Sequence, residues 1–158
     1  MKELQTLDSI EGMPGIDTLE GVIGPLMSGN KGSAHFIKMH ADMYCDAHSH
    51  PTESIIYTSK GQWVLFAEGK RRHMKEGSLF FMPPGIETGY EVPFDKPASI
   101  LIIKFEGEKD PQEFMDYLEG LKERLEAKNK NGEPFKMSEL PADHPALIFA
   151  NEIKSQEC

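Results

Sequence analysis

Short apolar segments separated by turn residues fill the chain from residue 33 to residue 105, and this pattern constrains the fold most strongly. Each segment is shorter than a typical helix and rich in β-branched or aromatic residues, as in β-strands. Glu68-Gly69 predicts a tight hairpin turn between two of them. Strands at this spacing favour a sandwich or barrel closed on itself. The predicted strands cover residues 34–39, 53–58, 62–68, 70–74, 78–82, 88–92 and 99–105.

The two ends of the chain follow other patterns. Residues 1–30 contain repeated glycines and prolines, so we expect an arm with an edge strand near residues 19–27. The sequence Asp110-Pro111-Gln112-Glu113 predicts an N-cap, a first-turn proline and a capping box, and an apolar stripe extends the helix to residue 129. The predicted organisation is an N-terminal arm (1–30), a β-domain (31–107) and a helical extension (108–158).

Composition excludes several classes of partner. The 158 residues, 39% of them hydrophobic, suffice for one domain. The net charge of −9 repels phosphate backbones and anionic lipids, so we expect no nucleic acid and no membrane partner. We find no apolar stretch of spanning length and no signal-peptide core, which predicts a cytoplasmic protein. Cys45 and Cys158 are too few for a disulfide framework, and both are expected to be reduced thiols.

Two histidines, His48 and His50, stand two residues apart just before a β-branched run. On a strand, side chains two apart project from the same face, so both imidazoles can reach one small cation. Neutral imidazole suits iron, nickel, copper and zinc alike. The pair therefore indicates a mononuclear metal site in the β-structure. The alternative is that two of the six histidines are near neighbours on a solvated loop.

A second segment, from Gly77 to Thr88, is a short apolar strand that runs into a Pro-Pro-Gly turn. Together the two segments resemble the cupin superfamily, whose motifs read G-x5-H-x-H-x(3,4)-E-x6-G and G-x5-P-x-G-x2-H-x3-N. The resemblance spans residues 31–106. It implies a small RmlC-like cupin, a double-stranded β-helix or jelly-roll barrel, and a homodimer, because cupin barrels commonly pair sheet edges. The matching positions are His48, His50, Gly61, Gly77, Pro83 and Gly85.

The chain departs from the cupin motifs at two of the four usual metal ligands. Ser54 stands where the first motif has its glutamate, and Thr88 where the second motif has its histidine. Glu53 lies one residue early, and strict alternation turns Ser54, not Glu53, toward the metal side. A bulge or bend before Glu53 would be needed to turn it inward. The resemblance thus implies a divalent metal site of His48 and His50, with Glu53 as the nearest carboxylate.

Other side chains are candidates for the cavity. Thr88 and Tyr90 share the parity of the missing histidine, so both are expected to face the interior together with Ser54. Tyr57 and Tyr90 are the candidate catalytic residues, as proton donors. Cys45 would be a good soft ligand as a thiolate. Alternation places it on the face opposite to the histidine pair, so a small buried apolar role is expected.

Three functions follow from this sequence. The first is a cupin that holds Fe, Mn, Ni or Zn and acts on a small organic molecule as a dioxygenase or an isomerase. The second is metal-free chemistry resembling that of sugar-nucleotide epimerases, in which a histidine abstracts a proton and a tyrosine returns it. The third is a non-catalytic sensing barrel with an eroded metal site. The fold alone does not choose among them.

Overall fold

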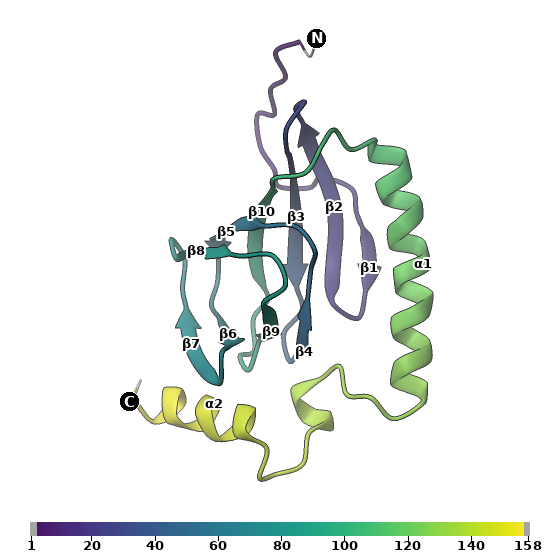
Figure 1. Ribbon diagram of the computed structural model, residues 1–158. Coiled ribbons are helices and arrows are strands. Elements are labelled where there is room, and N and C mark those ends of the chain that lie inside the picture. The colour runs from purple at the N-terminus through teal and green to yellow at the C-terminus, as the bar shows by residue number, and fades with distance from the viewer. Residues whose placement is uncertain (1–2, 157–158) are drawn as a thin grey trace.

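The computed structural model describes residues 3–156, which form two antiparallel β-sheets with helices at their margins (Figure 1). The larger sheet has the order β1-β2-β3-β10-β5-β8, and the smaller sheet has the order β4-β9-β6-β7. The strands are β1 (Ile16–Thr18), β2 (Gly21–Ser28), β3 (Ser33–Met39), β4 (Tyr44–Ser49), β5 (Ser54–Lys60), β6 (Trp63–Ala67), β7 (Lys70–Met74), β8 (Leu79–Met82), β9 (Glu87–Glu91) and β10 (Ala98–Lys104). The helices are α1 (Pro111–Lys130), the short 3-10 helix η1 (Met137–Glu139) and α2 (Pro145–Gln156).

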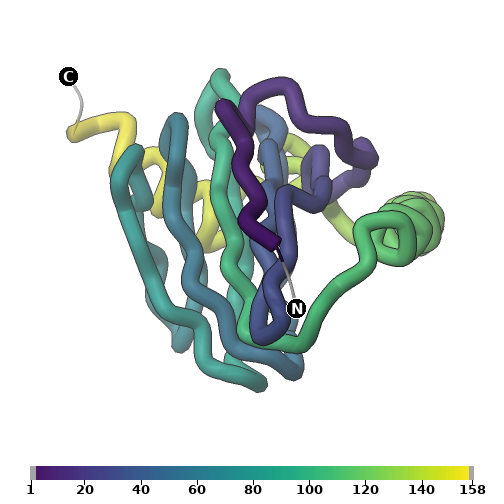
Figure 2. The backbone as a smooth tube through the Cα atoms, turned by 90° about the horizontal axis from the view of Figure 1, so that it is seen from above, coloured from purple at the N-terminus to yellow at the C-terminus, as the bar shows by residue number. Residues whose placement is uncertain are grey.

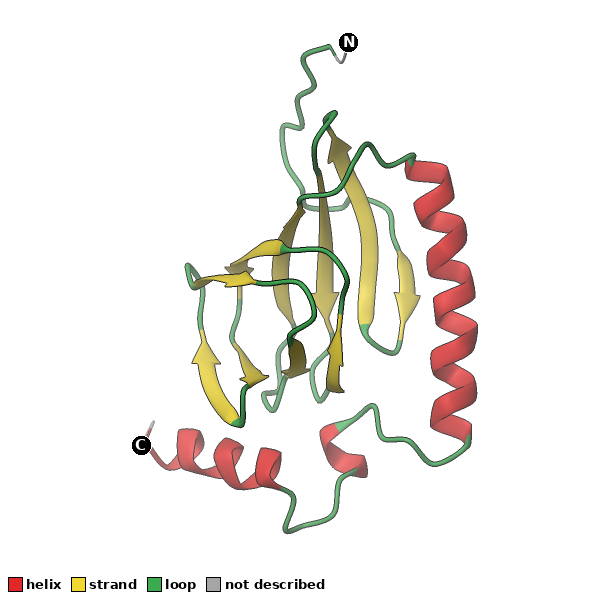
Figure 3. Ribbon diagram, viewed as in Figure 1, coloured by secondary structure: helices red, strands yellow, loops and turns green. Residues whose placement is uncertain are grey.

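This architecture confirms the predicted all-β barrel with a C-terminal helical extension, and the segregation of strands and helices is plain in Figure 3. The predicted strands correspond to β3 and to β5 through β10. Strand β4 was missing from that series, because Asp46, His48 and Ser49 interrupt its apolar pattern. The strand that carries the first histidine of the pair was therefore the hardest to predict.

The N-terminal segment is continuous with the larger sheet. The predicted edge strand near residues 19–27 is β2, but β2 pairs with β1 on one side and β3 on the other, so β1 is the edge. The tight β1–β2 turn needs glycine at Gly21, whose φ is +109° and where a Cβ would lie 2.6 Å from the Lys38 carbonyl oxygen. This turn carries Glu20, whose amide donates to Thr18 Oγ1 at 3.0 Å.

The main core lies between the two sheets. Trp63 of β6 is fully buried, its ring stacks on Tyr90 at 5.3 Å, and its indole N–H donates to Thr58 Oγ1 at 2.9 Å. Met39, Ile56 and other side chains from the larger sheet pack against it. A buried indole needs such a hydrogen-bond acceptor, so Thr58 is the polar residue that this core requires.

Helix α1 runs along β1 and β2 at one side of the barrel, and α2 lies on the other side (Figure 2). The buried residues of α1 are Phe114, Leu118 and Leu125, which follow the apolar stripe predicted from the sequence. Asp110 occupies the N-cap position, but its side chain makes no capping hydrogen bond, so the predicted capping box is wrong. Pro111 instead begins the helix where its missing N–H is no loss.

Helix η1 and helix α2 pack against the smaller sheet. Met137, Leu140, Ala146 and Ala150 form a small apolar cluster around Tyr44 of β4. None of the helices within residues 3–156 is long and apolar enough to cross a membrane. Cys158, expected to be a reduced thiol, lies outside the described residues.

Candidate metal and ligand site

A β-bulge in β4 arranges the side chains of the site. On β4 the register advances three residues, from Cys45 to His48, while on β9 it advances two, from Tyr90 to Thr88. The extra residue breaks the two-residue alternation, so Cys45 and His48 both face the cavity. The expectation that Cys45 points away from the histidine face is therefore wrong, because strict alternation does not hold across a bulge.

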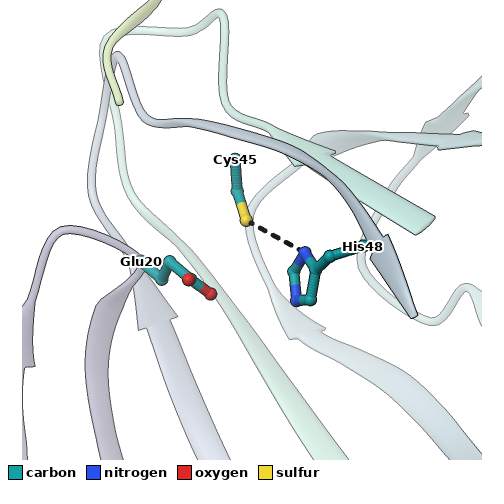
Figure 4. Close-up of side chains that lie close together, drawn as sticks. All are labelled: Glu20, Cys45 and His48. Carbon is teal, nitrogen blue, oxygen red and sulfur yellow. Dashed lines mark hydrogen bonds between the residues drawn. The ribbon is translucent and has the colours of Figure 1, made fainter. Parts of the chain in front are cut away.

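Glu20, Cys45 and His48 converge inside the barrel, and Figure 4 shows their functional groups pointing toward one another. One donor atom from each lies within 4.8 Å of the others, and Cys45 Sγ lies 3.8 Å from His48 Nδ1. Sequence reasoning missed Glu20, because it lies in the N-terminal arm with no motif around it. The β1–β2 turn brings it to the bulge.

The donor set of this cluster fits a transition-metal ion. Imidazole nitrogen, thiolate sulfur and carboxylate oxygen are the side-chain ligands of zinc and iron sites. His48 Nδ1 donates to the Asp46 carbonyl oxygen at 3.0 Å, which leaves Nε2 as the nitrogen available to a cation. Burial raises the pKa of the Cys45 thiol well above its usual value, and Glu20 raises it further, so the thiol is neutral without a cation beside it.

His50 lies next to this cluster. Its ring meets the His48 ring edge-on with the centroids 4.7 Å apart, and both line the cavity. Burial lowers the pKa of His50 to about 4, with smaller contributions from His48 and Lys104. The imidazole is therefore neutral at neutral pH, which is the form that binds metal ions.

The three residues that the sequence predicts to face the cavity lie in different settings. Ser54 is fully buried and lines the cavity, and its hydroxyl has no hydrogen-bond partner in the described part of the chain. Tyr90 also lines the cavity, and burial raises its pKa to about 12. Thr88 lies behind Tyr90 and outside the cavity lining, with its hydroxyl 3.2 Å from the Tyr90 hydroxyl and 3.4 Å from Met82 Sδ. Thr88 therefore orients the tyrosine.

Glu53 and Tyr57 lie away from the cavity. Glu53 is outside the cavity lining and outside the donor cluster, while its neighbour Ser54 faces inward, as strict alternation predicts for β5. The side chain of Tyr57 is 39% exposed on the outer face of the same strand. Glu20, and not Glu53, is thus the carboxylate that groups with Cys45 and His48.

The cavity has a volume of about 230 Å³ and lies between the sheets and α1. Its walls are mainly apolar, with a few polar groups, which is the composition of small-molecule sites. The apolar walls include Ile23, Ile37, Ile56, Ile102, Phe114 and Leu118, and the polar groups include Glu20, His48, His50, Ser54, Tyr90 and Lys104.

Comparison with solved structures supports the fold. An uncharacterized double-stranded β-helix protein from Klebsiella pneumoniae is 16% identical, with a TM-score of 0.58, over 66% of this chain and 92% of that one. An RmlC-like cupin from Shewanella frigidimarina is 16% identical, with a TM-score of 0.57, over 72% and 99%. The DMSP lyase DddQ from Ruegeria pomeroyi is 26% identical over 49% of this chain, with a TM-score of 0.46, and the match spans only 39% of that enzyme.

Comparison at the level of families is more specific. No curated protein matches the chain. The family model of the AraC-like ligand-binding domain matches residues 30–143, which include strands β3 to β10 and helix α1. The chain is a member of the AraC-like ligand-binding domain family, built on the RmlC-like cupin barrel.

Proposed function

We propose that this chain binds one divalent metal ion, Fe, Mn, Ni or Zn, through His48 and His50 and holds a small organic molecule beside it in the barrel cavity. The observation that carries the proposal is the setting of His48. Its Nδ1 is fixed by the Asp46 carbonyl, and a thiol and a carboxylate converge on the same ring. Histidines that bind metals typically donate their other ring nitrogen in this way.

Cys45 and Glu20 complete the proposed donor set. Two histidines alone give a weak and exchangeable site, whereas catalytic metal sites usually have three protein ligands. A bound ion would act as a Lewis acid toward an oxygen of the organic molecule. The protein side chains have separate roles: the apolar walls exclude water, and Tyr90, held by Thr88, offers a protonated hydroxyl to the ligand.

Ligand binding is the part of this proposal that the family supports most directly. The matching family is described as a ligand-binding domain, and the cavity has the mainly apolar lining that such a role requires. A sensing barrel and an enzyme would both use this cavity. They differ in whether the bound molecule is changed.

The geometry also supports a metal-free alternative. The ring centroids of His48 and Tyr90 lie 6.4 Å apart in the cavity, so an imidazole base and a phenol acid could both reach one small ligand. Tyr57 cannot take that part, since it lies on the outer face. This alternative predicts activity that survives metal removal.

The test of the metal proposal is elemental analysis of protein purified without a histidine tag. We expect stoichiometric divalent metal in the parent and a loss of metal in the double variant His48→Ala/His50→Ala. The matched control is His40→Ala, because His40 lies outside the cavity and pairs with Asp17 at 2.6 Å. Metal that survives in the double variant, or a parent without metal, would reject the proposed site.

We also propose a homodimer formed through the outer face of β5, β8 and β10. Leu79 and Phe81 on the edge strand β8 are 63% and 55% exposed, and they lie in register with Tyr57 and Ile55 of β5. A contiguous apolar face of this kind marks an interface, and a two-fold axis would cover it with its own copy. Sedimentation analysis should give a dimer mass that Phe81→Lys reduces to the monomer. A monomeric parent would contradict this assembly.

A further inference from the structure

A polar row crosses one end of the inner face of the larger sheet. Lys104 of β10 is in register with Ser33 of β3 on one side and with Ser54 of β5 on the other. Two residues before Lys104 on β10, Ile102 is in register with Ile56 of β5, and both isoleucines line the cavity. On β5 and β10 the cavity wall thus changes from apolar to polar within one step of the strand alternation.

The hydroxyls of this row find no partner among residues 3–156. Ser33 Oγ and Ser54 Oγ make no hydrogen bond within that part of the chain, and Ser54 is fully buried while Ser33 is 8% exposed. A buried hydroxyl without a partner destabilises a protein by about 1–3 kcal/mol, so such groups are uncommon unless something else satisfies them. Ser54 lines the cavity, and because its hydroxyl has almost no accessible surface, a small rotation of the side chain is needed to present it to a bound molecule.

Lys104 is the unpaired cation of the cavity. It lines the cavity and is partly buried, and no hydrogen bond or ion pair to its ammonium is found within residues 3–156. Lys109, which also lines the cavity, differs, since its ammonium bonds Glu106 at 2.9 Å and lies 4.7 Å above the Phe114 ring. Burial lowers the pKa of Lys104, and the Glu106 carboxylate, which bonds Lys109, offsets only part of that effect.

We infer that Lys104 and Ser54 bind the carboxylate of a small organic acid whose apolar body lies along Ile56 and Ile102. The inference rests on the proposed function, because it names the class of molecule that occupies the same cavity. One ammonium and one free hydroxyl match the charge and the two acceptor oxygens of a carboxylate. The chain carries a net charge of −9, so selection of an anion requires a local cation of this kind.

The local charge selects a monoanion over a phosphate. Lys104 is the one cavity lysine without a carboxylate partner among the described residues, and Glu20 adds negative charge to the same cavity. A phosphate ester would bring a charge of about −1.5 to −2 against that single ammonium. The mainly apolar remainder of the cavity likewise favours an acid with a hydrocarbon body over an inorganic anion.

The test compares hexanoate with its neutral isostere hexanamide by isothermal titration calorimetry of the full chain. We expect the parent to bind hexanoate at least about tenfold more tightly than hexanamide, a difference of about 1.4 kcal/mol. Lys104→Met should abolish this preference. The matched control Lys38→Met should keep it, because Lys38 lies on the outer face of β3.

Three outcomes would overturn the inference. They are no binding of hexanoate by the parent, equal binding of hexanoate and hexanamide, and sulfate displacing hexanoate with similar affinity. Ser54→Ala provides a second variant in case Lys104→Met fails to fold. It should weaken hexanoate binding several-fold while leaving the thermal midpoint of the free protein unchanged or higher, because it removes an unsatisfied hydroxyl. A fall in the midpoint would instead indicate a purely structural serine.

Metal analysis of the same samples separates this inference from the metal proposal. A parent that lacks metal but shows a Lys104-dependent preference for hexanoate would reject only the metal site. A parent that holds metal at His48 and shows no preference would reject only the carboxylate site.

Discussion

Gly89 of β9 supports the bulge that builds the site, and Gly89→Ala tests that role. Gly89 lies opposite the bulged residues of β4, and a Cβ there would lie 3.1 Å from the Cys45 carbonyl oxygen and 3.3 Å from the Ala47 amide nitrogen. Both neighbours are backbone atoms, which cannot rotate away as a side-chain tip can. The added methyl group must therefore push the bulge or move β9.

The magnitude follows from two opposing effects. Overpacking by a methyl group costs about 1–3 kcal/mol. Replacing glycine also stabilises the folded state by about 0.4–1 kcal/mol, because the unfolded chain loses freedom. The steric effect is larger here, so we expect a net loss of about 0.5–2 kcal/mol, with a midpoint lower by roughly 2–4 °C per kcal/mol for a chain of this size.

The matched control is Gly107→Ala, where a Cβ would meet nothing within 4 Å and the backbone does not require glycine. Its stability should stay within about 0.5 kcal/mol of the parent. Thermal and urea unfolding of both variants measure the difference, and metal content should fall in Gly89→Ala because the bulge orients Cys45 and His48. If Gly89→Ala is as stable as Gly107→Ala, the steric reasoning about the bulge is refuted.

Three further predictions concern the core. The Arg71 guanidinium donates hydrogen bonds of 3.0–3.2 Å to the buried Glu91 carboxylate. Arg71→Met leaves that carboxylate without its cation, so it should lower the free energy of unfolding in urea by about 3–5 kcal/mol, and a loss below about 1 kcal/mol would contradict this. Thr58→Val should cost about 1–3 kcal/mol by stranding the Trp63 indole N–H, and an unchanged midpoint would show that the hydrogen bond is dispensable. Burial lowers the pKa of His35 to about 3, so the unfolded chain binds an extra proton below pH 6.5, and His35 should contribute a fall in stability of up to about 1.4 kcal/mol per unit of decreasing pH. His50 adds to the same slope, so His35→Gln should make the slope shallower by that amount, and an unchanged slope would refute the assignment.

The sequence predicted the barrel because its signals are local. Turn residues such as Gly61 and Gly77, both at positive φ, mark where strands end, and the apolar stripe of α1 needs only its own period. His48 and His50 were found for the same reason, since their spacing is visible within one segment. Both histidines line one cavity, His48 from β4 and His50 from the position just after that strand.

The parts that sequence reasoning missed depend on contacts distant in the chain. Glu20 reaches His48 only because the β1–β2 hairpin joins the larger sheet beside the bulge. The bulge turns Cys45 to the same face as His48, and no residue type within β4 predicts a bulge there. Lys104 and Ser54 become neighbours through strand register, which a single strand pattern does not reveal.

Anomalous scattering from crystals of the untagged protein tests the central claim most directly. Data collected at the absorption edge of the metal found by elemental analysis locate that ion without assumptions about its ligands. We expect one anomalous peak inside the barrel, in bonding contact with His48 Nε2 and with His50, and with Cys45 and Glu20 around it. A cavity without a peak, or a peak bound elsewhere in the molecule, would contradict it.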